Sequence, residues 1–287
     1  MANTNTSLDS IHDIAVQVEV HPDYDDAKYE IQKVRNCIAG SPTIKREQYT
    51  YLPHPSQIDT NSKLQQMRSL QTMLGKMRIN EAEVELPDQI DYLVGNADGD
   101  GQSFRASMEY AISNILQTKW HVLVADYTGL TDVDLKSVSL ADRAALNPRA
   151  SIKQYKRENV VNWHFDRIGG KMQLRWIMLL ESGTDFNNTT YTHTSVQSYI
   201  ILALDDNGDY YQKKIVYSQD GKEEGGDSYV KVNGQPLKFL PVEIVSDQEL
   251  NAGFLPVAVG ALHPICEASL YKYRVSAVYK EVQRNLA

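Results

Sequence analysis

The chain has 287 residues, 42% of them hydrophobic, which is enough material for one large core or two modest ones. Its formal net charge of −8 argues against a conventional nucleic-acid binder, because such a protein presents a basic patch that neutralises phosphates. The first residues lack the basic and apolar regions of a signal peptide, and nowhere do about 18 apolar residues run together, so we expect cytosolic synthesis and no membrane partner.

The reactive residue types are scattered. Cys37 and Cys266, the only cysteines, lie far apart in the sequence, and no CxxC or Cys/His pair has metal-site spacing. We therefore expect two reduced thiols. The seven histidines occur singly, and Gly170-Lys171 lacks both the first glycine and the Ser or Thr of a P-loop. The sequence thus predicts no catalytic site and no cofactor.

Helical spacing dominates the first 120 residues. Apolar residues recur at three- and four-residue steps over residues 23–38, 63–79 and 104–116, which predicts three helices. Prolines at positions 53 and 55 predict an extended segment before the second helix. The apolar run at residues 120–125, interrupted only by His121, predicts a strand covered on both faces.

Strand and turn patterns dominate the second half. Turn residues at 166–170, 205–208 and 233–234 each separate two β-rich runs, so we expect three successive antiparallel hairpins. Residues 131–157 indicate a loop-rich insertion, and residues 218–228 indicate a polar loop that divides the sheet strands.

A final helix is expected from Pro264 to Leu286, because proline is favoured at the first helical position. Its apolar stripe comprises Tyr271, Val275, Val278 and Val282. Its cations form either a solvated face or a surface that faces DNA or another subunit. They are Lys272, Arg274, Lys280 and Arg284.

These elements together predict an α+β fold. We expect a helical N-terminal half packed with an antiparallel hairpin sheet, followed by a long C-terminal helix. The expected divisions are an arm with a helix at residues 1–50, an α+β domain at residues 51–260 and the closing helix at residues 261–287.

The segment at residues 96–101 has the first half of a calcium-binding loop. Asn96, Asp98 and Asp100 take ligand positions 1, 3 and 5, and glycine takes position 6. Position 12, which needs a bidentate glutamate, is Ser107. We therefore favour a glycine-containing turn with Ser103 capping the next helix, and keep a calcium-binding module as the alternative.

The order of segments resembles the portal proteins of tailed bacteriophages. The resemblance rests on YLPHP, an ELP extension, IDYLVGNADGDGQSFRASMEYA, WHVLVAD, YKRENVVNW followed by a hairpin, and the terminal LYKYRVSAVYKEVQRNLA. It covers roughly residues 45–287. Val278 stands where that family's helix pattern tends to have aspartate.

The resemblance implies a structural protein, not an enzyme, that forms a ring of typically twelve subunits at one capsid vertex. The ring would be the conduit for packaging and ejecting double-stranded DNA, with the major capsid protein, the terminase and a tail adaptor as partners. The chain would correspond to the wing portion, with residues 261–287 leading toward the stem and channel. It would be located in the virion, and in the host cytoplasm during assembly. The alternative is another phage structural component, either a head-completion adaptor or a tail protein.

Overall fold

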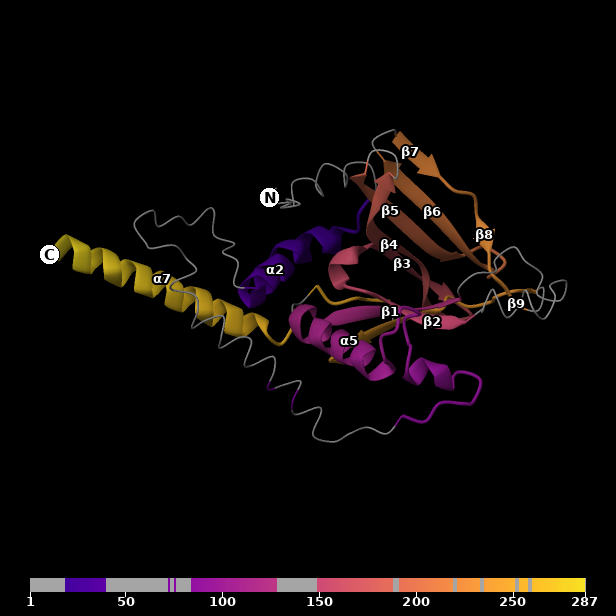
Figure 1. The fold of residues 1–287 in the computed structure, drawn as a ribbon, viewed down its shortest axis with the longest axis horizontal. Coiled ribbons are helices and arrows are strands. Elements are labelled where there is room, and N and C mark those ends of the chain that lie inside the picture. The colour runs from indigo at the N-terminus through magenta and orange to yellow at the C-terminus, as the bar shows by residue number, and fades with distance from the viewer. Residues whose placement is uncertain are drawn as a thin grey trace.

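The computed structural model describes residues 19–39, 84–127, 149–187, 191–218, 221–232, 235–250, 253–257 and 260–286, with the single positions 72 and 75 (Figure 1). Apart from positions 72 and 75, which are helical, the helix expected at residues 63–79 lies outside these residues, as does the extended segment before it. The first and third expected helices are confirmed as α2 (Pro22–Ala39) and α5 (Phe104–Thr118).

A six-stranded antiparallel sheet forms the upper part of the molecule in Figure 1. The hairpin of β3 (Val160–Ile168) and β4 (Lys171–Asn187) and that of β5 (Thr192–Leu204) and β6 (Tyr210–Ser218) are both confirmed. Gly169 and Gly170, with φ of 59° and 82°, make the first turn, because glycine enters the left-handed region without a steric penalty. β4 pairs with β5 and thereby joins the two hairpins into one sheet.

A smaller antiparallel sheet has the order β11–β1–β2. Its central strand is β1 (Trp120–Tyr127), flanked by β2 (Ala150–Tyr155) and β11 (Val242–Ser246). The expectation of a strand covered on both faces is confirmed, since Trp120, His121 and Val122 are all buried.

The main core lies between the two sheets. Trp120 of β1 meets Trp163 of β3 edge to face, with ring centroids 5.9 Å apart, a favoured geometry for aromatic pairs. Val122 and Val124 of β1 join Ile177 and Leu179 of β4 in the same buried cluster. His121 points the other way, toward α5, so the small sheet is sandwiched between α5 and the large sheet.

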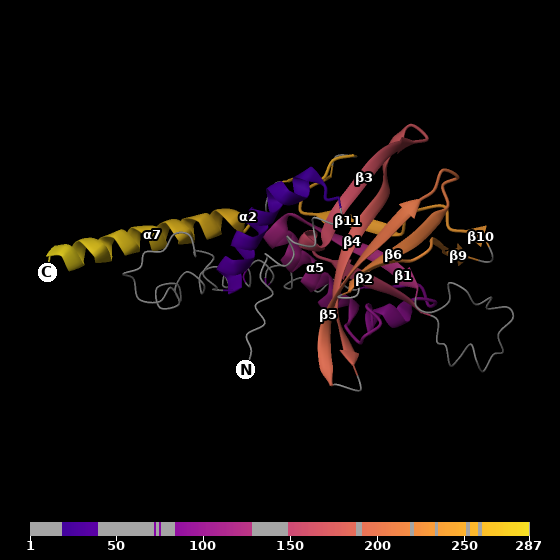
Figure 2. The same ribbon diagram turned by 90° about the horizontal axis from the view of Figure 1, so that it is seen from above.

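Helices and short turns complete the arrangement. α2 packs against α5, against β3 and against the 3-10 turn η2 (Arg157–Asn159), and η1 (Asp91–Val94) precedes α5. The helix α7 (His263–Leu286) contacts α2 near its first turns and then extends away from both sheets, as both views show (Figures 1 and 2).

The expected fold class, a helical N-terminal half packed with one hairpin sheet, is wrong. The described residues are strand-rich and form two antiparallel sheets, with a separate two-stranded pair. The error arose because β1 finds its partners β2 and β11 far along the chain, and a local pattern carries no information about such long-range pairing.

Three local expectations also need correction. Residues 150–155, assigned to a loop-rich insertion, form β2, while residues 128–148 lie outside the described part. The polar loop at residues 218–228 contains β7 (Gly221–Glu224), an edge strand paired with β6; its charged sequence suits an edge, where it opposes pairing with other chains. The third hairpin is reduced to β9 (Lys231–Val232) and β10 (Gln235–Pro236), outside the large sheet, while β8 (Ser228–Tyr229) pairs with β6.

Candidate functional site

The turn at residues 96–101 uses its polar side chains to hold its own backbone. The amide oxygen of Asn96 accepts hydrogen bonds from the N–H groups of Gly99 and Gly101, each at 2.9 Å. Both glycines have positive φ, 92° and 101°. Ser103 accepts a hydrogen bond from the N–H of Ala106 and caps α5. The predicted turn and helix cap are confirmed.

Asp98 is engaged in the same way. Its Oδ1 accepts hydrogen bonds from the N–H groups of Asp100 and Gln102 at 2.9 and 3.0 Å. Slight desolvation acts to raise the pKa of Asp98, but these backbone hydrogen bonds outweigh it and lower the pKa. Ser107, at the twelfth position, is buried and accepts a hydrogen bond from Gln154, so it faces the protein interior.

A buried polar network explains why a histidine interrupts the apolar run of β1. The ring Nε2 of His121 lies 2.9 Å from Gln154 Oε1, and Gln154 Nε2 donates to the Ser107 carbonyl at 2.9 Å. Burial lowers the pKa of His121 to about 4, because the charged imidazolium loses its hydration. At neutral pH the network therefore holds an uncharged histidine between α5, β1 and β2.

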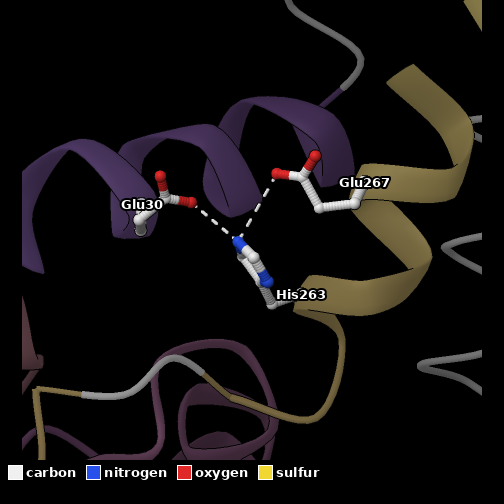
Figure 3. A group of neighbouring side chains, drawn as sticks. All are labelled: Glu30, His263 and Glu267. Carbon is white, nitrogen blue, oxygen red and sulfur yellow. Dashed lines mark hydrogen bonds and ion pairs between the residues drawn. The ribbon is translucent and has the colours of Figure 1, made fainter. Parts of the chain in front are cut away.

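An ionic cluster joins α2 to the first turns of α7 (Figure 3). His263 Nε2 lies 2.7 Å from Glu30 Oε2 and 3.6 Å from Glu267 Oε1. Lys33 Nζ lies 3.1 Å from Glu30 Oε2 and 2.6 Å from Glu267 Oε1. The acidic and basic groups come from both helices, so the cluster fixes the angle at which α7 leaves the body.

In this cluster the acidic and basic groups stabilise each other's charged forms. Desolvation acts to raise the pKa of Glu30, but hydrogen bonds from His263 and Lys33 lower it overall. Desolvation acts to lower the pKa of Lys33, and the bonds to Glu267 and Glu30 raise it overall. Among histidine, cysteine, aspartate and glutamate side chains of the described residues, Glu30, His263 and Glu267 are the one trio with ligand atoms within 4.8 Å. Lys33 already supplies the compensating positive charge there.

The two cysteines meet beside this ionic cluster. Cys266 is fully buried with Val34 and Leu262, and the partly buried Cys37 packs against the same group. A hydrogen bond joins the two thiols; that bond, together with burial, raises the pKa of Cys266. Residues near opposite ends of the sequence thus share one contact at the base of α7.

Arg35 of α2 links two other elements, η2 and α5. Its Nε and Nη2 lie 2.9 and 3.1 Å from the two carboxylate oxygens of Glu158 in η2. Its Nη1 and Nη2 also donate to Gln117 and Asn114 of α5, at 2.6 and 2.7 Å. Such a two-pronged arginine–carboxylate pair is stronger than a single contact and fixes orientation.

The segment before α7 is also held tightly. Arg157 donates to the carbonyls of Thr118, the last residue of α5, and Val257, both at 2.8 Å. The N–H of Leu262 donates to the carbonyl of Leu116 at 3.0 Å. Gly260 passes so close to α5 that an added Cβ would lie 2.6 Å from the backbone carbon of Gln117.

The distal part of α7 has the opposite character. Its apolar side chains are exposed, with 69% exposure at Tyr271 and 50%, 49% and 48% at Val275, Val278 and Val282. We call these four residues the distal stripe. Lys272 and Arg284 are exposed, and Arg274 and Lys280 are also on this helix, although the surroundings of their side chains lie outside the described part.

A surface pocket of about 380 Å³ lies beside the turn at residues 96–101, and another of about 600 Å³ lies beside β8. The first brings Asp98 and Asp100 near Glu181 of β4. Tyr155 donates a hydrogen bond to Glu181 at 2.6 Å, which engages that carboxylate. The pocket therefore gathers acidic groups that are partly committed to internal hydrogen bonds.

The α2–α7 junction could not be predicted from the sequence. Its members lie at both ends of the chain, as with Glu30 and Glu267 or Cys37 and Cys266, and local spacing cannot pair them. The distal stripe and the cations were identified, because helical periodicity is local.

No helix in the described ranges is both long and apolar enough to cross a membrane. A scan against protein-family models finds no match to this chain, and a search of curated proteins finds none either.

Proposed function

We propose that this protein is a structural subunit that assembles with copies of itself through α7, and that the assembly is the portal ring of a tailed bacteriophage. The observation that carries the proposal is the distal stripe, an apolar face on a helix that has left the body of the protein (Figure 2). An apolar face of this kind is normally covered by a partner.

The spacing of the distal stripe specifies the shape of that partner. Tyr271, Val275, Val278 and Val282 follow one another at steps of four, three and four residues. This alternation is the pattern by which one helix packs along another. Burial of the four half-exposed side chains would contribute about 1 kcal/mol each, so a second copy of α7 is a fitting occupant.

The portal assignment rests on the segment order described above, from YLPHP to LYKYRVSAVYKEVQRNLA. It is supported by the acidic net charge, since a channel through which DNA slides benefits from few phosphate-gripping sites. In this assignment the two sheets form the wing, and α7 leads toward the channel and the neighbouring subunit. The partners are then double-stranded DNA, the major capsid protein, the terminase and a tail adaptor.

Electron microscopy of the purified full chain and of virions tests the assignment. We expect closed rings with a central channel, and a single antibody-labelled site at one capsid vertex. Antibody label spread over the capsid lattice or along the tail would instead identify the protein as another phage structural component. If the purified chain is monomeric under every condition tested, the proposal that it assembles with copies of itself is wrong.

A further inference from the structure

Cys37 and Cys266 are the chain's only thiols, and the fold brings them together. Cys37 is in the last turn of α2, and Cys266 is in the first turn of α7. The thiols are hydrogen-bonded to each other and packed with Val34 and Leu262. Any bond between these two sulfurs would tie the base of α7 to α2.

We propose that Cys37 and Cys266 form a reversible disulfide that locks α7 onto α2 when the surroundings become oxidising. The noncovalent clamp beside them, Lys33 with Glu30 and Glu267, already holds the two helices in register. That pre-alignment favours ring closure between the thiols over reaction with another molecule. The inference does not depend on the portal assignment.

The difference in exposure sets the order of reaction. Cys37 is partly exposed, whereas Cys266 has no exposed surface. A low-molecular-weight disulfide such as oxidised glutathione therefore meets Cys37 first. The Cys37 thiolate attacks one sulfur of oxidised glutathione, and a mixed disulfide forms as the first glutathione thiolate leaves.

The second exchange closes the protein disulfide. Cys266 gives up its proton and attacks the Cys37 sulfur, and the second glutathione leaves as a thiolate that takes up the proton. Overall, two protein thiols and one oxidised glutathione become one protein disulfide and two reduced glutathiones. The two electrons lost by the cysteines reduce the glutathione disulfide, so the exchange balances. In a reducing cytosol the pair returns to the thiol form.

The consequence is mechanical. The ion pairs of Lys33 with Glu30 and Glu267 are partly exposed, so salt weakens them. Salt does not weaken a disulfide bond. The crosslink would also enclose most of the chain in one loop, and a crosslink across a long loop restricts the unfolded state strongly. The disulfide would thus make the orientation of α7 insensitive to ionic strength.

The test equilibrates the reduced, folded full chain with oxidised and reduced glutathione over a range of ratios. Remaining thiols are alkylated, and the products are measured by intact mass and by peptide mapping. The expected product is a chain that is not crosslinked to another copy, has lost two hydrogens, carries no glutathione and yields a linked Cys37–Cys266 peptide. Cys266→Ala should instead keep one glutathione on Cys37, because the thiol that completes the exchange is missing.

A thermal measurement gives a second readout. Oxidised wild-type protein should unfold about 4 °C or more above the reduced form, and Cys37→Ser should show no such difference. A wild-type chain that retains glutathione would overturn the proposal. So would crosslinks between chains, or thiols that react only after denaturation. The intact mass of the wild-type chain shows whether the Cys37–Cys266 disulfide forms, even if the Cys266→Ala variant does not fold.

Discussion

The two parts of α7 are one continuous helix in opposite environments. Around its first turn, Leu262 and Cys266 are buried, and His263 and Glu267 are paired with α2. Beyond Ser269, the apolar side chains of the distal stripe are between 48% and 69% exposed. The comparison separates two roles: the base of α7 is fixed by the body, whereas the distal part presents a surface.

Because of this difference, substitutions in the two parts of α7 should affect different properties of the protein. Substitutions at the base or in the body should change the free energy of unfolding of the subunit. Substitutions in the distal stripe or its cations should leave that free energy nearly unchanged and alter assembly.

Gly260→Ala should be the most destabilising change. The added Cβ would overlap the Leu116 carbonyl oxygen and lie 2.6 Å from the backbone carbon of Gln117. Backbone atoms at the end of α5 cannot move aside cheaply, so we expect a loss of about 3 kcal/mol or more in urea unfolding.

Gly95→Ala is the matched control for Gly260→Ala. Gly95 has φ of −90°, and its nearest neighbour to an added Cβ is 3.9 Å away, so alanine fits. A change below about 0.5 kcal/mol is expected at Gly95. Equal effects at the two glycines would show that the connection before α7 is not tightly held.

The buried His121 predicts a loss of stability in acid. Its folded pKa of about 4 lies below the ordinary 6.5, because burial disfavours the charged ring. The unfolded chain therefore binds a proton that the folded chain excludes. Stability should be complete above pH 6.5 and fall as the pH drops toward 4, by at most about 3 kcal/mol.

His121→Gln isolates this contribution, because glutamine can still bond Gln154 but takes up no proton in this range. Unfolding free energies of wild type and variant, measured from pH 7 to pH 4, should fall less steeply for the variant. Parallel pH profiles would mean that His121 takes up its proton at the same pH in the folded and the unfolded chain, which would contradict its lowered pKa.

Arg35→Ala should cost about 2 kcal/mol, since it removes the hydrogen bonds that Arg35 gives to the Glu158 carboxylate and to the amide oxygens of Asn114 and Gln117. Arg105→Ala is the comparison, because Arg105 is 56% exposed and lies 3.5 Å from Glu109 on the same helix. There we expect less than about 0.5 kcal/mol. Similar losses in thermal or urea unfolding would contradict the assigned role of Arg35.

The smallest effect on unfolding is expected for the cations of α7. Joint replacement of Lys272, Arg274, Lys280 and Arg284 by alanine should change the unfolding free energy by under about 0.5 kcal/mol. If these cations face DNA or a neighbouring subunit, the yield of packaged DNA or of assembled rings should drop. An unchanged yield of both would exclude either role.

Local pattern predicted local structure in this chain. The bounds of α2 and α5, the first two hairpins and the turn at residues 96–101 all followed from spacing and turn chemistry. The small sheet did not, because β1 pairs with β2 and β11 across long stretches of sequence. The charged sequence of the edge strand β7 indicates a loop for a related reason: nothing in that sequence shows that it pairs with β6.

The candidate site divides in the same way. The helical stripe of α7 could be predicted, since periodicity shows which residues share a face. The junction could not, because Arg35 meets Glu158, and Cys37 meets Cys266, only once the whole chain is folded. The buried face of α5 is unusually polar, with Ser107 and Asn114 inside, because both bond to residues of other elements.

Sedimentation velocity of the full chain and of a Val275→Asp/Val278→Asp variant tests whether the distal stripe joins the subunits. Wild type should sediment as an assembly of several copies. The variant should sediment as a folded monomer that still unfolds cooperatively, because a charge at each valine is tolerated in water and not inside a helix–helix contact. A monomeric wild type, or a variant that assembles as well as wild type, would contradict the claim that α7 joins the subunits.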